Sequence, residues 1–446
     1  MNISKKVHFL GIGGSGASAV AAIANSYGFE VTGCDLNPFN EFTSSAFQPG
    51  VVKLNKGHSP DHLLDTIDIL AVTPAIFSLD PKNPELLEAK KLGIEILTWQ
   101  QFMGKYLEGG KFVIAVAGTH GKTTTTAMVA QILEDAHLDP TVELGTIIPK
   151  WKSNYRVGKS KFFITEADEF NDNFLASHPD ITVLTNIEMD HPEYFKDFES
   201  YKQSLLKFLY QVKGKIIANL SDPGVSAVLE TFQKDKEKKY NPEIIDYSKS
   251  EINFPLKVMG EFNKLNATAA FQVGLTLGID PTIIRSSLMR FSGTQRRLEH
   301  LGKFKGADIY SDFGHHPTEI KVTMEAVREK YPQRRIILIF QPHMFSRTKA
   351  LFDDFVKVLK DLPVNQVMVM DIYPSREKDT GLISSKDLVE AIKNPLVAYI
   401  GSLQEAEKFI ELGIRIGDLV IFMGAGNIDE LARKLVKGKD TLLLRS

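Results

Sequence analysis

Short apolar runs that end in glycine or polar residues recur along this chain, and most are followed by a stretch with helical periodicity. Examples are the runs 7–10, 112–117 and 335–340. A run of four to eight apolar residues before a helix is typical of a strand buried in a parallel sheet. The alternation of strands and helices predicts an α/β protein, and 446 residues are too many for one ordinary domain.

The first apolar run, 7–10, leads directly into Gly11-Ile12-Gly13-Gly14-Ser15-Gly16 and an alanine-rich helix over 17–27. A second strand, 30–33, ends at Asp35. A glycine turn at a helix N-terminus suits a diphosphate, and an acid after the next strand suits a ribose hydroxyl. The pattern therefore favours a dinucleotide such as NAD or a substrate diphosphate, and a tight packing turn is the alternative without a ligand.

A stronger signal follows the run 112–117, because Gly118-Thr119-His120-Gly121-Lys122-Thr123-Thr124 precedes a helical stretch over 125–136. Backbone amides beside the glycines can point at phosphate oxygens. The Lys122 ammonium can neutralise phosphate charge, and the Thr123 hydroxyl can bind Mg²⁺. We interpret this loop as a phosphate site, although a helix start can carry Gly-Lys-Thr without binding anything.

Polar side chains follow the next two predicted strands, 162–165 and 181–184. Ligands of open parallel sheets bind where strands end, so Glu166 and His191 are candidate Mg²⁺ ligands beside Thr123. Only one or two protein carboxylates normally bind Mg²⁺. Helix capping or local pairing is therefore the alternative for the other acids, which are Asp168, Glu169 and Asp190.

Two asparagines, Asn263 and Asn266, lie three residues apart before the apolar helical stretch 267–277. Side chains at this spacing share a helix face and can read an adenine edge, although Asn263 can also simply cap the helix. Further strand signals continue to 419–423, and polar residues cluster at their ends. We expect the adjacent pair His315-His316 to be structural, because chain neighbours rarely converge on one ion.

Composition narrows the partners to small molecules. The 53 basic and 55 acidic residues give a formal charge of −2, which shows no footprint for nucleic acid. Cys34 is the single cysteine, which fits a reducing compartment. No apolar run is long enough to span a bilayer, so we expect a cytoplasmic protein without membrane insertion.

These motifs occur together, and in this order, in one known family. The matching segments are 8–18, 57–58, 117–126, 166–169, 185–186 with 190–191, 263 with 265–267, 296–297, 312 with 314–319, 340–343, 346–348, 371–374 and 423–426. The chain therefore resembles the Mur ligases, the ATP-dependent amide-forming enzymes of peptidoglycan assembly.

The resemblance implies a fold of three α/β domains. Residues 1–107 would form a Rossmann-like domain that binds a UDP substrate. Residues 108–293 would form a central P-loop ATPase-like domain, and residues 294–446 a Rossmann-like domain that closes over ATP and binds the amino acid. We expect a monomer or a weak homodimer.

The resemblance also implies roles for single residues. ATP would be bound by Gly118, Thr119, His120, Gly121, Lys122, Thr123, Thr124, Asn263, Asn266, Arg297 and Asp312. The other substrates would be bound by Gly13, Gly14, Ser15, Gly16, Asp35, His58, His191, His343 and Arg347. Mg²⁺ would be bound by Thr123, Glu166 and His191, and catalysis would depend on Lys122, Glu166, His191 and Arg297.

The implied reaction joins L-alanine to the lactyl carboxylate of UDP-N-acetylmuramate through an acyl phosphate. The segment 371–374 resembles the L-alanine branch of the family. Leu298 resembles the recycling branch, which joins a murein tripeptide to the same sugar nucleotide. Met344 stands where the family has an arginine, at a position that bears on recognition of the amine. Both amine substrates therefore remain as alternatives.

Overall fold

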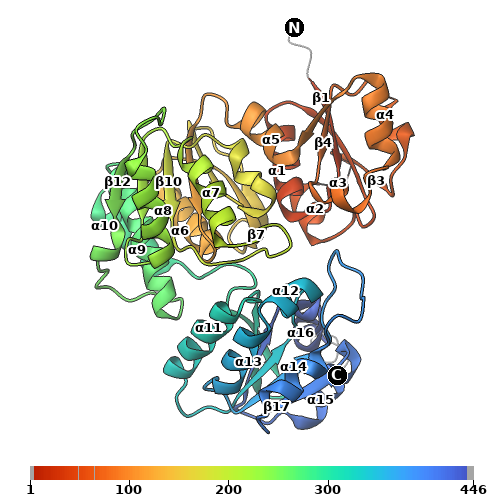
Figure 1. Ribbon diagram of the computed structural model, residues 1–446, viewed down its shortest axis with the longest axis vertical. Coiled ribbons are helices and arrows are strands. Elements are labelled where there is room, and N and C mark those ends of the chain that lie inside the picture. Colours follow the sequence, from red (N-terminus) through yellow and green to blue (C-terminus); the bar gives the residue numbers. More distant parts are fainter. Residues whose placement is uncertain (1–4, 49, 65, 439–446) are drawn as a thin grey trace, which may run out of the picture. The chain divides into compact units, whose positions relative to one another are not determined.

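The computed structural model describes residues 5–48, 50–64 and 66–438, which form two compact units. The first unit comprises residues up to Asp190 together with 194–256 and 265–294. The second comprises 191–193, 257–264 and the chain from Gln295 onward. Figure 1 shows the elements of both units, and each unit is described by itself.

The first unit begins with a five-stranded parallel sheet in the order β3-β2-β1-β4-β5. Its strands are β1 (Lys6–Leu10), β2 (Glu30–Asp35), β3 (Lys53–Lys56), β4 (Ile69–Val72) and β5 (Glu95–Thr98). Its helices and turns are α1 (Ser15–Ser26), α2 (Glu41–Ala46), η1 (Pro60–Leu63), α3 (Ala75–Leu79), α4 (Pro84–Leu92), α5 (Trp99–Phe102) and the π-helical turn η2 (Met103–Leu107).

The second sheet of this unit has seven strands in the order β12-β11-β10-β6-β9-β7-β8, with only β8 antiparallel to its neighbour. The strands are β6 (Phe112–Ala117), β7 (Thr141–Ile148), β8 (Ser153–Arg156), β9 (Phe162–Glu166), β10 (Ile181–Leu184), β11 (Lys215–Ala218) and β12 (Glu243–Asp246). The helices and turns are α6 (Lys122–Asp135), η3 (Phe170–Ala176), α7 (Phe198–Leu209), α8 (Pro223–Lys234), η4 (Tyr247–Lys249), α9 (Glu261–Thr276) and α10 (Pro281–Arg290).

The two sheets of the first unit share a hydrophobic core. Helix α1 packs against β7 and β8 (Figure 1). Phe9 and Phe102 from the first sheet region belong to the same buried cluster as Val113 and Phe163 from the second. Burial of aromatic side chains from both sheets stabilises them as one body.

The second unit contains a six-stranded sheet in the order β13-β14-β18-β15-β16-β17, in which only β13 is antiparallel. The strands are β13 (Glu299–Phe304), β14 (Ala307–Asp312), β15 (Ile336–Phe340), β16 (Gln366–Met370), β17 (Val397–Gly401) and β18 (Leu419–Met423). The helices are α11 (Pro317–Lys330), α12 (Phe345–Ala350), α13 (Phe352–Asp361), α14 (Ser385–Ile392), α15 (Leu403–Gly413) and α16 (Ile428–Lys437).

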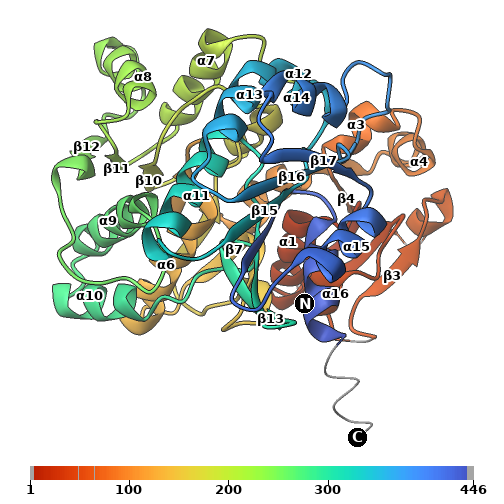
Figure 2. The ribbon, with the colours of Figure 1, turned by 90° about the horizontal axis from the view of Figure 1, so that it is seen from below.

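Alternate residues of β15 supply the two cores of this sheet. Leu338 lies in a cluster with residues of α11, α13 and α14, whereas Ile337 and Ile339 lie in a cluster with α15 and α16. Figure 2 shows β15, β16 and β17 side by side, with these two groups of helices apart from each other. A strand covered on both faces has to be apolar throughout, which explains the continuous run in the sequence.

The predicted fold class is confirmed, and two helix starts are corrected. Helix α6 begins at Lys122 rather than Thr125, because Gly121 at φ +83° serves as its N-cap. Helix α9 begins at Glu261 rather than Ala267, so both asparagines lie inside it. Helix α5 continues without a break into the π-helical turn η2, which begins at Met103.

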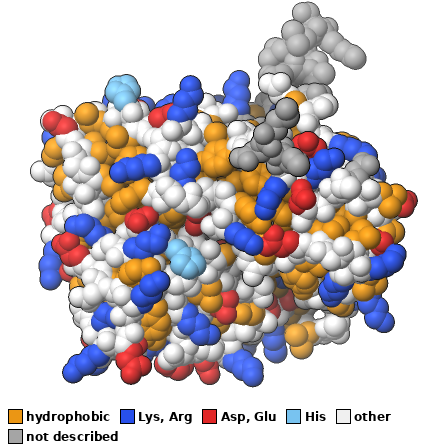
Figure 3. Space-filling view, turned by 90° about the horizontal axis from the view of Figure 1, so that it is seen from above, with side chains coloured by type: hydrophobic (Ala, Val, Ile, Leu, Met, Phe, Trp, Pro, Cys, Tyr) orange, Lys and Arg blue, Asp and Glu red, His pale blue; other side chains and the backbone are white. Residues whose placement is uncertain are grey.

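The surface drawn in Figure 3 mixes lysine and arginine with acidic side chains, in keeping with the near balance of charge along the chain. Among the residues that the structure describes, no helix combines the length and the apolar character that a membrane crossing requires.

Candidate active site

The loop between β6 and α6 requires its two glycines. Gly118 has φ +127° and Gly121 has φ +83°, values that side-chain-bearing residues rarely adopt. A Cβ atom on Gly118 would overlap the Thr185 hydroxyl, and one on Gly121 would overlap the Asn266 amide. The loop therefore lies too close to its neighbours for any other residue at these positions.

Asn186, just after β10, holds this loop in place. Its backbone carbonyl accepts the amide of Thr119 at 2.9 Å, and its side-chain oxygen accepts the amide of His120 at 2.9 Å. The side-chain nitrogen of Asn186 donates to the carbonyl of His120 at 3.0 Å, and the Thr185 hydroxyl donates to the same carbonyl at 2.7 Å. The amides of Thr119 and His120 are thus used within the protein. The backbone amides that can bind a phosphate are those of the first turn of α6.

Lys122, at the start of α6, is held by Glu169, an acid for which the sequence suggested only helix capping or local pairing. Its ammonium donates to both carboxylate oxygens of Glu169, at 3.0 and 2.9 Å, and to the carbonyl of Gly118 at 2.6 Å. Burial by itself would lower the pKa of Lys122, but nearby carboxylates, chiefly Glu169, outweigh it and raise that pKa. Lys122 therefore remains a cation in a largely buried site.

Thr123 and Glu166 come together as the sequence predicted. The Thr123 hydroxyl donates to Glu166 Oε2 at 2.9 Å, and the amide of Gly145 donates to Glu166 Oε1 at 2.8 Å. A hydroxyl and a carboxylate side by side form the hard oxygen donor set that suits Mg²⁺. Asp168 accepts bonds from Phe170 and Asn173 nearby, which is the kind of local pairing that the alternative describes.

Glu143 on β7 is a buried acid that the sequence analysis missed. Burial, reinforced by the charge of Glu166, raises its pKa to about 8, while the Thr165 hydroxyl donates to it at 2.7 Å. A protonated Glu143 limits the negative charge next to Glu166. The one feature of the sequence that could have indicated this buried acid is its position inside the mainly apolar stretch 141–148.

Asn263 and Asn266 take different places along α9. Asn263 does not cap the helix, since α9 begins two residues earlier, and its side-chain nitrogen donates to the carbonyl of Met259 at 2.7 Å. The Asn266 amide lies directly against Gly121. Asn266 thus lies beside the phosphate loop, and its predicted role in binding adenine stays a prediction.

The first glycine loop is bound to Asp35 through its own backbone. Gly13 donates its amide to Asp35 Oδ2 at 3.0 Å, and Asn37 donates to Oδ1 at 2.9 Å. Gly14 is the N-cap of α1 and has no side chain to satisfy the first-turn amides of the residues that follow, Ser15 and Gly16 among them. The predicted residues 13–16 and Asp35 therefore do assemble.

The side chain of His58 is largely buried, with 13% of its surface exposed. Its Nδ1 is 3.3 Å from the sulfur of Cys34, the residue before Asp35. Its contact is thus with the buried side of the first sheet.

In the second unit, Arg297 and Asp312 each contact residues close to the other in the sequence or the fold. Arg297 is 3.5 Å from Glu319, and Asp312 accepts the amides of Leu298 and Gly314 at 2.8 and 2.7 Å. Burial raises the pKa of Asp312 to about 6 despite the nearby Arg297 charge.

The remaining predicted residues of this unit are His343, Arg347 and His191. Arg347 lies 3.3 Å from His343 Nδ1, and burial together with nearby cationic groups lowers the pKa of His343 to about 3. His191 lies 3.2 Å from Glu193, which also accepts from Arg376 at 2.6 Å. Met344, which stands where the family has an arginine, is buried and has a φ of +71°.

Three domain models of one family cover most of the chain. They are the Mur ligase family catalytic domain over residues 6–110, the Mur ligase middle domain over 116–274, and the Mur ligase glutamate ligase domain over 296–426. The chain belongs to the Mur ligase family.

Relatives within this family match over nearly their whole length. The UDP-N-acetylmuramate–L-alanine ligase of Agathobacter rectalis is 37% identical over 455 residues, which cover 97% of each chain. The enzyme of the same name from Clostridium kluyveri is 38% identical and covers 95% of this chain and 96% of its own. This Mur ligase therefore matches curated relatives from end to end.

Solved structures agree on the fold. The UDP-N-acetylmuramate–alanine ligase MurC of Thermotoga maritima aligns with a TM-score of 0.78 at 26% identity, covering 98% of this chain and 99% of its own. A murein peptide ligase from Psychrobacter arcticus aligns with a TM-score of 0.70 at 22% identity, which shows the fold alone.

The buried acid Glu143 gives a prediction for the pH dependence of stability. Its pKa of about 8 in the folded protein exceeds its ordinary value of 4.5, so its contribution to stability is complete below pH 4.5 and is lost as pH rises to 8. Relative to wild type, Glu143→Gln should gain about 1 kcal/mol or more in unfolding free energy over this range. Denaturant unfolding across the range measures it, with the exposed Glu230→Gln as control. A gap between Glu143→Gln and wild type that does not change with pH would contradict the assignment.

The Lys122–Glu169 pair gives a second prediction. Lys122→Met removes the cation that neutralises the buried Glu169 carboxylate and should cost about 3–5 kcal/mol of unfolding free energy. Adding Glu169→Gln removes that charge, so the double variant should recover most of this loss while ATP turnover stays at least about 100-fold below wild type. Thermal unfolding and phosphate release measure the two effects separately, with Lys90→Ala on the exposed face of α4 as control. If the double variant recovered ATP turnover together with stability, Lys122 would have no role in the reaction.

Proposed function

We propose that this Mur ligase joins L-alanine to the lactyl carboxylate of UDP-N-acetylmuramate with ATP as the energy source, as a step of peptidoglycan precursor synthesis in the cytoplasm. The observation that carries the proposal is end-to-end similarity at 37–38% identity to ligases of that name, together with a complete phosphate loop. The murein peptide ligase is less similar, at 22% identity, which favours L-alanine over the tripeptide.

The proposed chemistry has two steps. A carboxylate oxygen of the sugar nucleotide attacks the γ-phosphorus of ATP, and the bond to the bridging oxygen breaks to release ADP. The amine of L-alanine then attacks the acyl carbon, loses a proton and expels inorganic phosphate. A carboxylate is a poor electrophile and phosphate a good leaving group, so the acyl phosphate makes amide formation feasible.

The residues of the first unit would serve the first step. Lys122 would move part of its bonding from Glu169 to the γ-phosphate and neutralise its charge, and the amides at the start of α6 would hold phosphate oxygens. The hydroxyl of Thr123 and the carboxylate of Glu166 would hold Mg²⁺. The ion, when bound, supplies positive charge beside the β- and γ-phosphates.

We assign the other roles by family resemblance. The loop 13–16 with Asp35 and His58 would bind the UDP part, and Asn263 and Asn266 would bind adenine. From the second unit, Arg297 and Asp312 would serve ATP, His343 and Arg347 the amino acid, and His191 a metal or substrate. We retain 1–107, 108–293 and 294–446 as the three functional domains, and a monomer or weak homodimer as the assembly.

The test is phosphate release with Mg·ATP and UDP-N-acetylmuramate, with L-alanine, glycine, L-serine or L-Ala-D-Glu-diaminopimelate as the amine. We expect release that depends on L-alanine, with the buried Met344 no obstacle to its binding. Release only with the tripeptide would assign the protein to the recycling branch. No release with any amine would contradict the proposed activity, and omission of Mg²⁺ should abolish the L-alanine signal.

A further inference from the structure

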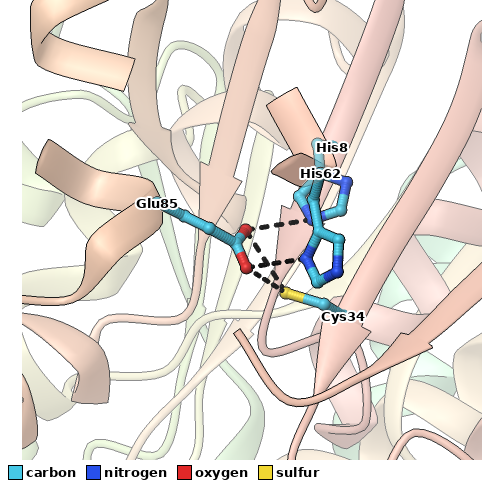
Figure 4. A group of neighbouring side chains, drawn as sticks. All are labelled: His8, Cys34, His62 and Glu85. Carbon is cyan, nitrogen blue, oxygen red and sulfur yellow. Dashed lines mark hydrogen bonds and ion pairs between the residues drawn. The ribbon is translucent and has the colours of Figure 1, made fainter. Parts of the chain in front are cut away.

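Four side chains that could ligate a metal converge on the buried side of the first sheet, and a fifth, His58, lies beside them at 3.3 Å from the Cys34 sulfur. They are His8 on β1, Cys34 on β2, His62 in η1 and Glu85 in the first turn of α4, drawn in Figure 4. One ligand atom from each lies within 4.8 Å of all the others. The spacings of 26, 28 and 23 residues (8 to 34, 34 to 62, 62 to 85) match no short metal motif, so only the fold reveals the group.

Glu85 lies at the centre of the cluster. Its carboxylate accepts from Cys34 Sγ at 3.1 and 3.3 Å and lies 2.9 Å from His62 Nδ1 and 3.1 Å from His8 Nε2. A tetrahedral zinc ion holds nitrogen, oxygen and sulfur ligands about 3.4–3.6 Å apart, as its bond lengths require. The distances from Glu85 to the other three side chains would therefore lengthen by a few tenths of an ångström around the ion.

The orientation of His8 points to a ligand. Its Nδ1 is 2.7 Å from the Thr32 hydroxyl, so an Nδ1–H that donates there leaves a lone pair on Nε2, which faces the cluster. His8 is fully buried, and its Nε2 makes no hydrogen bond of proper geometry although it lies 3.1 Å from Glu85.

Charge and access also suit a divalent cation. A thiolate from Cys34 and a carboxylate from Glu85 together balance a charge of +2, so the occupied site would be neutral in a buried position. The thiol proton would pass to water on binding. His62 is 16% exposed whereas Glu85 is fully buried, which leaves a way in from the His62 side.

We infer that His8, Cys34, His62 and Glu85 form a structural site for a thiophilic divalent cation, with Zn²⁺ as the best match. The ion would join four elements of the first sheet region. Cys34 also accepts the amides of Gly11 and Ile12 through its carbonyl, so the ion would brace the base of the first glycine loop. The site is separate from the Mg²⁺ donors Thr123 and Glu166.

The test uses Co²⁺ as a spectroscopic stand-in for zinc on the full chain, after treatment with a chelator and its removal. Cys34 is the only cysteine, so a thiolate-to-cobalt charge-transfer band can arise from this site alone. We expect a band that saturates at one ion per chain and disappears when Zn²⁺ displaces the cobalt. Zn²⁺ should also raise the thermal unfolding midpoint.

Variants sharpen the result. Cys34→Ser should lose the band, and His62→Asn should weaken cobalt binding at least about tenfold. The exposed His137, whose φ of +58° asparagine tolerates, gives the matched control His137→Asn, which should bind as wild type does. If Cys34→Ser fails to fold, the wild-type spectrum still decides. No thiolate band in wild type at saturating cobalt, or unchanged binding in His62→Asn, would overturn the inference.

Discussion

The hydrogen bonds between Asn186 and the backbone of the loop 118–121 are the constraint on which the candidate active site depends. Parallel pairing of β6 with β10 brings Asn186 to the loop, and the Asn186 contacts then fix the backbone immediately before α6. A loop held in this way presents Lys122 and Thr123 from the first turn of a helix, where the helix dipole and open amides favour an anion. The positions of Glu166 and Glu169 on the neighbouring segment complete the arrangement.

Local patterns sufficed to predict the fold class and the Thr123–Glu166 pair. Strand-end residues of a parallel sheet meet at one edge, and glycine turns mark themselves in the sequence. The roles of Glu169 and Asn186 depended on which strands become neighbours, which the order β10-β6-β9 decides and a single sequence does not reveal. The start of α9 was missed because Glu261 to Asn266 has no clear apolar period.

Buried acids follow a common principle in the first unit, although each is accommodated differently. Glu169 is paired with a cation, Glu143 is accommodated by a raised pKa, and Glu85 is surrounded by histidine and thiol groups. Burying a carboxylate is costly unless it is paired, protonated or bound to a metal. The partners of such acids cannot be predicted from a single sequence because they come from distant segments, as in the cluster around Glu85.

We propose that this Mur ligase activates the lactyl carboxylate as an acyl phosphate at the β6–α6 loop. The most direct test is to follow oxygen from UDP-N-acetylmuramate labelled with ¹⁸O in its lactyl carboxylate, during turnover with ATP and L-alanine. We expect one labelled oxygen in each inorganic phosphate released, because the carboxylate oxygen stays with phosphorus when the amide forms. Amide product accompanied by unlabelled phosphate would contradict it.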